Sequence, residues 1–160
     1  RKKQGILPVL SIRDNISVSV LDELKSGISI SRKKENELAR NVIETYDVKT
    51  PGADKEIQFL SGGNQQKVII GRAMACKPKL LVFDEPTKGI DVGTKTEIYR
   101  LMKKLAEEEG IGIIMISSEM EEIKKCSNRV IAMYEGKIAG EFDEYTEQQA
   151  ILGAIIGVDS

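Results

Sequence analysis

The sequence predicts an α/β fold with a largely parallel sheet. Two short apolar runs, 80–83 and 113–116, have the character of buried parallel strands. An amphipathic pattern over 94–109 predicts a helix between them, and Ser118 with Glu121 is typical of a capping box at the start of another helix. Strands that alternate with helices in this order belong to an α/β domain whose sheet is mostly parallel.

The chain before residue 77 is expected to be mainly helical. Residues 6–30 alternate short apolar runs with proline, glycine and serine, which indicates irregular structure with one short helix around 18–24. Apolar residues at helical spacing predict a helix over 32–46. Another helix is expected over 61–75, with Ser61 as its cap.

The C-terminal part predicts a strand pair and a last helix. Residues 129–133 and 137–142 favour strands that are joined by a tight turn at Glu135-Gly136. The last helix is expected to start near Thr146, with Gln149 completing a second capping box.

Composition excludes several classes of function. The 160 residues suffice for one domain with a core, and a formal net charge of −1 gives no overall field that would attract nucleic acid. Two cysteines without paired spacing and no histidine argue against a zinc site and for reduced thiols. No apolar run approaches the roughly 20 residues that cross a bilayer.

The segment LSGGNQQKV places two glycines directly after the capping Ser61. Glycines at a helix start let an anion approach the exposed backbone N–H groups, where the helix dipole adds partial positive charge. Taken alone, the segment fits equally well a glycine-containing turn that binds nothing.

The segment LLVFDEPTKGIDVG places Asp84 and Glu85 at the carboxyl end of a buried strand, where ligands of open α/β sheets bind. Asp84 could hold Mg²⁺ and Glu85 could polarise an attacking water. The alternative is a strand that ends in acids because it reaches solvent. Asp91 lies at the centre of the following sharp turn, 88–93.

Together the two segments resemble the nucleotide-binding domain of an ABC transporter. The asparagine in LSGGN, and SSEM after the next strand, resemble the second ATPase cassette of bacterial sugar importers of the ribose, galactose and methyl-galactoside type. The resemblance runs from Arg1 to Phe142. It implies part of a P-loop NTPase, with a helical subdomain over 1–76 that ends in the signature helix. Residues 77–160 would then be the Walker B, D-loop and H-loop part of the α/β core, with a C-terminal hairpin and helix.

The resemblance also implies a role for each matching position. The signature, which would contact the γ-phosphate of ATP held by the opposite cassette, corresponds to Ser61, Gly62, Gly63 and Asn64. Asp84 would lie near Mg²⁺, Glu85 would be the general base or would orient the attacking water, and Asp91 would belong to the D-loop that crosses the cassette dimer.

The chain departs from the family pattern in three places. The family's phosphate-binding loop would lie before Arg1. Residues 89–96 resemble that loop only superficially, because they follow the Walker B strand instead of preceding it. Ser118 stands where the family has its switch histidine, a position that contacts nucleotide. A serine there cannot act as a cationic sensor of the γ-phosphate. The ATP site of this cassette is therefore expected to hydrolyse ATP below the full rate. Asn64 stands where glutamine is commoner.

The missing phosphate-loop strand would lie between the 113–116 and 129–133 strands. Without it both strands would have open edges, so we expect them to come together or to take a strand from a second copy.

The expected function is ATP hydrolysis as part of a sugar importer at the cytoplasmic face of the cell membrane. The expected partners are a second cassette, membrane-spanning permease subunits and, indirectly, a sugar-binding protein, but no nucleic acid. The chain opens with Arg1 instead of Met, which indicates an excised segment. We expect this segment to be inactive alone, because nothing in it would cradle the α- and β-phosphates of ATP. The alternatives are a non-catalytic cassette that only completes the other ATP site and docks the permease, and a soluble ABC ATPase that is not linked to transport.

Overall fold

The computed structural model describes residues 5–157, and their contacts divide them into two compact units. The first unit consists of the chain up to Leu81 together with Pro86–Ile114. The second consists of Val82–Glu85 together with the chain from Met115 onward. The predicted domain limits include residues 1–4 and 158–160, which lie outside the described part, and the boundary expected after residue 76 stays a prediction.

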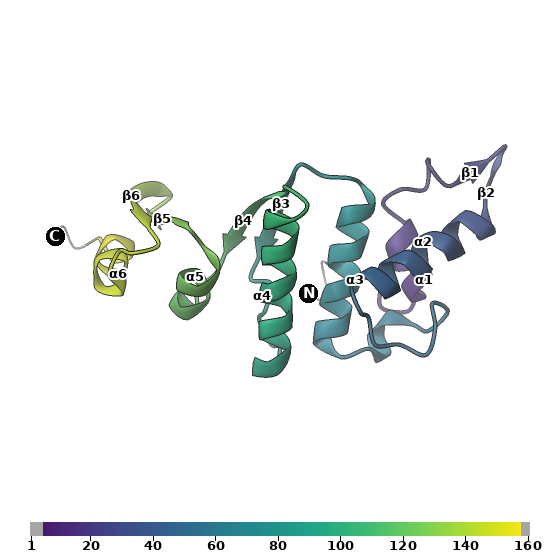
Figure 1. Ribbon diagram of the computed structural model, residues 1–160, viewed down its shortest axis with the longest axis horizontal. Helices are drawn as coiled ribbons and strands as arrows, with labels where there is room; N and C mark the ends of the chain where they lie inside the picture. The colour runs from purple at the N-terminus through teal and green to yellow at the C-terminus, as the bar shows by residue number, and fades with distance from the viewer. Residues whose placement is uncertain (1–4, 158–160) are drawn as a thin grey trace. The chain divides into compact units, whose positions relative to one another are not determined.

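The first unit is built on helices. In order they are α1 (Ile12–Ser17), α2 (Arg32–Thr45), α3 (Gly62–Ala75) and α4 (Val92–Glu107). α1 and α2 pack on one side of α3 and α4 lies on its other side (Figure 1). Their shared core consists of aliphatic side chains that are almost completely buried, including Ile12, Ile16, Ile57, Val68, Ile70, Ile98 and Leu105. The predicted helices over 32–46 and 61–75 are confirmed, and the one over 94–109 is confirmed with its start two residues earlier.

The short helix expected around 18–24 is wrong in position. α1 begins after Ser11, whose hydroxyl accepts from Asp14 N at 3.1 Å while the Asp14 carboxylate accepts from Ser11 N at 3.2 Å. This capping box starts the helix, and Ile12 and Ile16, four positions apart, form its buried face. Beyond it, β1 (Lys25–Ser26) and β2 (Ser29–Ile30) form a small antiparallel hairpin around Gly27, which has φ +65°. A 3₁₀ turn, η1 (Ile57–Phe59), precedes α3.

The two apolar runs form the strands β3 (Leu80–Asp84) and β4 (Gly112–Ile116) of one two-stranded sheet. Gly112 N donates to Lys79 O and Glu85 N donates to Ile116 O, both at 2.9 Å, so the strands start and end together and run parallel. Both predicted strands are confirmed. The expectation that they are fully buried is wrong, because side chains on one face of each strand are about half exposed, namely Leu80, Val82, Ile114 and Ile116.

The second unit contains α5 (Met120–Cys126), the antiparallel strands β5 (Arg129–Tyr134) and β6 (Lys137–Asp143), and α6 (Gln148–Ile155). The predicted hairpin is confirmed: Tyr134 faces Lys137 across Glu135 and Gly136, which have φ +47° and +77°. Positive φ at both residues is the signature of a type I′ turn.

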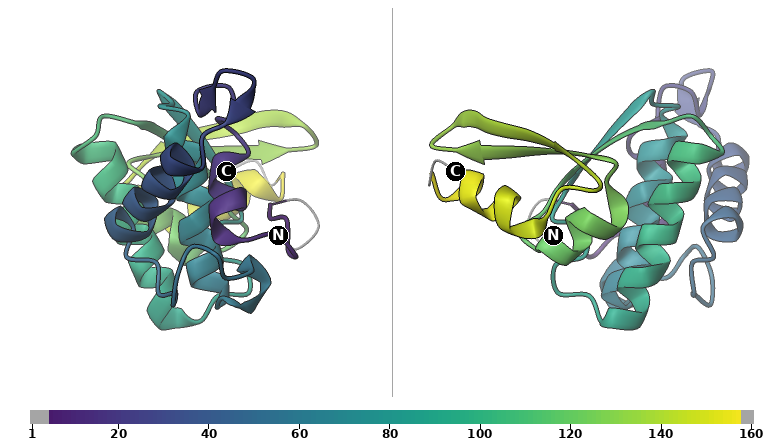
Figure 2. Two further views of the ribbon diagram at one scale, coloured as in Figure 1. Left: turned by 90° about the vertical axis from the view of Figure 1, so that its right-hand side faces the viewer. Right: turned by 60° about the vertical axis from the view of Figure 1, so that its left-hand side comes forward.

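α6 lies along one face of the hairpin and contacts both of its strands (Figure 2). Ile151 of α6 and Val130 and Ala132 of β5 are buried. The capping box expected from Thr146 and Gln149 is wrong. The Thr146 hydroxyl instead donates to Asp143 Oδ1 at 2.7 Å, so it closes the turn after β6, and α6 begins behind Glu147 without a side-chain cap.

The expectation that β4 and β5 come together is also wrong. Within residues 5–157, β4 pairs with β3 and β5 pairs with β6 in separate two-stranded sheets, and Ile131 and Met133 of β5 remain 47% and 59% exposed. Pairing with β6 and packing on α6 already satisfy one edge and one face of β5, which leaves its other edge open. Completion by a second copy stays a prediction.

Candidate functional site

Ser61 begins α3 as the sequence predicts. Its hydroxyl accepts from the Asn64 backbone N–H at 3.4 Å and from the Asn64 side-chain amide at 2.9 Å. The Asn64 side-chain carbonyl accepts from Lys49 N at 2.7 Å. Ser61 is exposed, and Gly62 and Asn64 are half-buried. The carboxamide of Asn64 therefore joins the preceding loop to the start of α3 at the exposed residue Ser61.

Gly63 is the buried member of this segment, and it packs against α4. A Cβ on Gly63 would lie 1.9 Å from Thr94 Cγ2. Thr94 is in turn held by Asp91, since Thr94 N donates to Asp91 Oδ1 at 3.0 Å and the Thr94 hydroxyl donates to Asp91 Oδ2 at 2.7 Å. These hydrogen bonds, first that of the Thr94 hydroxyl and then that of its backbone amide, lower the pKa of Asp91. The first unit thus brings the predicted signature and Asp91 into one cluster through Thr94.

An ion pair between a buried lysine and an exposed glutamate joins the same two helices one turn further along. The Lys67 side chain is only 8% exposed, and its ammonium lies 2.8 Å from Glu97 Oε2 and donates to Asp47 O at 3.1 Å. Glu97 lies on α4, so the contact ties the body of α3 to α4. α3 is therefore fixed to α4 at two points, at Gly63 and at Lys67.

Asp84 and Glu85 lie at the end of β3, in the second unit. Asp84 is exposed and Glu85 is half-buried. Glu85 has φ +47°, in the left-handed region that a non-glycine residue rarely adopts. Its carboxylate Oε1 accepts from the backbone N–H of Ser118 at 3.0 Å. The second unit thus brings Glu85 and Ser118 together through the Ser118 backbone, while the side chain of Ser118 is exposed.

Comparison with known proteins identifies the family of the chain. The family model described as ABC transporter matches residues 1–88, more than half of the chain. This chain belongs to the ABC transporter family.

Curated members of the ABC transporter family cover nearly all of the chain. Ribose import ATP-binding protein RbsA 2 of Rubrobacter xylanophilus is 46% identical over 99% of the chain, and RbsA 1 of the same organism is 44% identical over 96%. The chain spans only 30% and 31% of the length of these two relatives.

Solved ABC structures share the fold. A dimeric ATP-binding cassette in a post-hydrolysis state, bound to ADP and Pi, matches 90% of this chain and 62% of its own length with a TM-score of 0.71 and 25% identity. A nucleotide-free ATP-binding cassette from an ABC transporter matches 95% of this chain and 63% of its own length with a TM-score of 0.79 and 22% identity. The chain therefore has the α/β fold of part of an ABC ATPase cassette.

The predicted capping box of Ser118 and Glu121 is wrong. α5 begins behind Glu119 without a side-chain cap. The hydroxyl of Ser117, instead of that of Ser118, accepts from Glu119 N at 3.0 Å. Serine hydroxyls often close such turns onto the backbone two residues ahead. The turn from Ser117 to Glu119 precedes the helix. The three-residue spacing of Ser118 and Glu121 did not distinguish this turn from a helix cap.

Sequence reasoning missed residues that support the two clusters: Lys67, Thr94, Glu97, Ser117 and Glu122. Lys67 and Glu122 are charged residues inside predicted helices, and burial is the property that sets them apart. The helical pattern of each segment could have indicated that these side chains face inward.

Asp84 offers a Mg²⁺ ion an exposed carboxylate. Among residues 5–157, no group of three or more histidine, cysteine or acidic side chains gathers as a metal site would require. Mg²⁺ in ATPases commonly takes one or two carboxylates and completes its coordination with phosphate oxygens and water. The donor set at the end of β3 fits this mode, and it does not fit a metal site made by protein alone.

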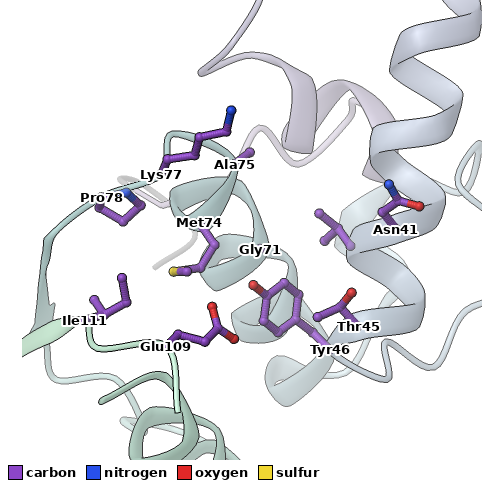
Figure 3. A pocket seen from close by; sticks show the side chains of 11 residues that line it. Asn41, Thr45, Tyr46, Gly71, Met74, Ala75, Lys77, Pro78, Glu109 and Ile111 are labelled. Carbon is purple, nitrogen blue, oxygen red and sulfur yellow. The ribbon is translucent and has the colours of Figure 1, made fainter. Parts of the chain in front are cut away.

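A shallow pocket of about 420 Å³ lies elsewhere in the first unit. It is lined by the C-terminal ends of α2 and α3 and by the segment after α4, with Glu109 beside Tyr46 (Figure 3). Burial, and then the charge of Glu109, raise the pKa of Tyr46. Met74 lies about 20 Å along α3 from Ser61 at 1.5 Å per residue. The pocket is therefore distinct from the signature end of α3.

No helix in the described part of the chain has the length and apolar character needed to span a bilayer.

Proposed function

We propose that this chain is part of the ATP-hydrolysing subunit of a sugar ABC importer and corresponds to its second cassette. The observation that carries the proposal is the placement of Glu85, whose carboxylate stands at the end of β3 and is held by the Ser118 amide. The identity of 44–46% with ribose import ATP-binding proteins over nearly the whole chain supports the transport class and the sugar.

Each predicted site residue has a role in this proposal. Ser61 and the N–H groups at the start of α3 contact the γ-phosphate of ATP that the opposite cassette holds, because a helix N-terminus favours anions. Asp91 keeps the start of α4 in place beside Gly63 at the same cassette interface. Asp84 contributes a carboxylate to Mg²⁺, which neutralises phosphate charge when bound.

Glu85 acts on the attacking water. Its carboxylate accepts a proton from the water as the water oxygen bonds to the γ-phosphorus, and ADP leaves with the electrons of the broken P–O bond. The hydrogen bond from Ser118 N to Oε1 fixes one carboxylate oxygen, which orients the other toward the water. Ser118 stands at the position of the switch histidine and supplies a backbone donor there without a cationic side chain.

The subunit would work at the cytoplasmic face of the membrane with a second cassette, permease subunits and a sugar-binding protein. Residues 1–76 would form the helical subdomain that faces the permease, and residues 77–160 would form part of the catalytic core. The 160-residue chain alone would not hydrolyse ATP, because no described segment cradles the α- and β-phosphates.

The experiment compares variants of the complete ATPase subunit that carries this chain, assembled with its permease in lipid vesicles. Glu85→Gln is expected to remove most of the ATPase activity contributed by this site, and Glu107→Gln, which changes an exposed carboxylate on α4, is the matched control. Unchanged hydrolysis and sugar uptake in Glu85→Gln would rule out a catalytic role for this cassette.

The second candidate is a non-catalytic cassette, which the serine at position 118 favours. In that case Glu85→Gln would leave hydrolysis and uptake unchanged, whereas Ser61→Arg, which blocks the N-terminal end of α3, would abolish both. A soluble ABC ATPase would instead retain full hydrolysis without any permease, and copurification of the subunit with permease would exclude it.

A further inference from the structure

Hydrogen bonds connect the segment 117–119 both to Glu122 of α5 and to the carboxylate of Glu85. Glu122 is only 2% exposed, and its Oε2 accepts from the Ser117 hydroxyl at 2.8 Å. The same hydroxyl accepts from Glu119 N at 3.0 Å. Between these two anchored residues, Ser118 N donates to Glu85 Oε1 at 3.0 Å. All of these residues belong to the second unit.

The contact with Glu85 depends on the direction of a backbone N–H. The Ser118 side chain is exposed and takes no part in it. The direction of an N–H group follows from the orientation of its peptide plane, and the 117–118 peptide lies between two anchors. The Ser117 hydroxyl both donates and accepts, so its rotation is fixed from two sides.

Glu85 needs such support because its backbone conformation is unfavourable for a residue with a side chain. Its φ of +47° lies in the left-handed region. Its own N–H donates to Ile116 O at 2.9 Å. The segment 116–118 therefore holds Glu85 at both its backbone and its carboxylate, and the conformation of this segment sets where the carboxylate lies.

We propose that Ser117 and Glu122 are positioning residues for Glu85. Glu122 fixes the Ser117 hydroxyl, Ser117 fixes the turn after β4, and the turn directs the Ser118 amide at Glu85 Oε1. We call this set of residues the Glu122 clamp. The inference rests on the proposed function of Glu85, because a positioned carboxylate matters only if it acts on the attacking water. The clamp itself is a structural relationship that exists independently of turnover.

Amide hydrogen exchange followed by NMR tests the clamp in the 160-residue chain. Ser117→Ala removes the hydroxyl and is expected to speed exchange at the Ser118 and Glu119 amides roughly tenfold, while amides in β5 and β6 keep their protection. Ser117→Thr retains the hydroxyl and Glu122→Gln retains an acceptor oxygen, so both should keep slow exchange. Ser118→Ala, which removes the neighbouring hydroxyl but retains the amide, is the matched control and should also keep it.

Two results would overturn the clamp. One is unchanged exchange at Ser118 in Ser117→Ala. The other is faster exchange throughout the second unit in Ser117→Ala, because that would mean general unfolding in place of a local release.

Steady-state hydrolysis by the complete subunit tests the effect on Glu85. Ser117→Ala is expected to lower kcat roughly 10- to 100-fold with little change in KM, because it displaces a reacting group without removing substrate contacts, and Ser117→Thr should restore kcat. Normal kcat in Ser117→Ala, combined with loss of turnover in Glu85→Gln, would overturn the positioning role and leave the proposed function intact. Turnover that survives Glu85→Gln would overturn the proposed function, whereas the exchange result decides the clamp separately.

Discussion

Gly63 and Thr94 are in such close contact that a Cβ on Gly63 would lie 1.9 Å from the Thr94 methyl carbon Cγ2. The glycine is therefore required for packing between α3 and α4, in addition to any role toward a phosphate. Since Thr94 is bound by Asp91, a displacement at Gly63 would also reach the turn before α4.

Gly63→Ala is expected to lower the free energy of unfolding by about 1–3 kcal/mol, because the added methyl group must push α3 and α4 apart. Adding Thr94→Ser should recover part of this loss, since it removes the clashing methyl group and keeps the hydroxyl for Asp91. Urea unfolding measures both variants. Gly52→Ala is the control, because nothing lies within 4 Å of a Cβ on Gly52. Equal stability of Gly63→Ala and Gly52→Ala would refute the packing role.

Glu97→Gln is expected to lower the free energy of unfolding by about 1 kcal/mol, because it removes the charge that faces the buried ammonium of Lys67, while the 54% exposure of Glu97 screens part of the interaction. Lys67→Met combined with Glu97→Gln should cost less than the sum of the single changes, since the pair then no longer contains an uncompensated charge. Thermal and urea unfolding of the double-mutant cycle provide the measurement. Glu107→Gln, which breaks an exposed pair with Lys103 on the same helix, should change stability by less than about 0.5 kcal/mol. Additive effects within the Lys67 and Glu97 cycle would contradict the coupling.

Acid should weaken the cap of α4. The hydrogen bonds from Thr94 lower the pKa of Asp91 in the folded chain. A group whose folded pKa is lowered stabilises the fold at pH above its unfolded pKa of about 4, and this contribution disappears as the pH falls through the lowered folded value. Asn caps helices without titrating, so the Tm of the chain relative to Asp91→Asn should fall between pH 7 and pH 3. A difference in Tm that stays constant over this range would show that the Asp91 charge does not stabilise the fold.

A substitution in the turn between β5 and β6 is expected to raise the free energy of unfolding. Glu135 has φ +47° before Gly136, and Asn tolerates this conformation better than Glu does. Glu135→Asn is therefore expected to stabilise the chain by about 0.5–1 kcal/mol, and Gly136→Ala, at φ +77°, to destabilise it by about 1 kcal/mol. Urea unfolding of the two variants checks the signs. Stabilisation by Gly136→Ala would mean that the turn is not of the I′ type.

Local patterns in the sequence predicted those elements whose signals are carried by neighbouring residues. The cap of α3 at Ser61, the end of β3 at Asp84 and the Glu135-Gly136 turn are of this kind, and the structure confirms all of them. The position of α1 was predicted wrongly because its signals, the Ser11 capping box and the apolar pair Ile12 and Ile16, span only six residues among proline and serine.

Contacts between distant parts of the sequence could not be predicted in this way. The Ser118 amide and Glu85 are separated by 33 positions, and no pattern of residue types indicates that they meet. The contact between Gly63 and Thr94 likewise depends on how two helices pack. The types of residue at the candidate site were therefore predictable, whereas the groups that hold them in place required coordinates.

At Glu85 the backbone conformation and the side-chain chemistry favour different residues. Glycine or asparagine would relieve the torsion, but only an acidic side chain provides the carboxylate. In a lineage that no longer depended on that carboxylate, random substitution would drift toward the relaxed residues. The amino acid found at this position among relatives should therefore record which cassettes remain under selection for chemistry.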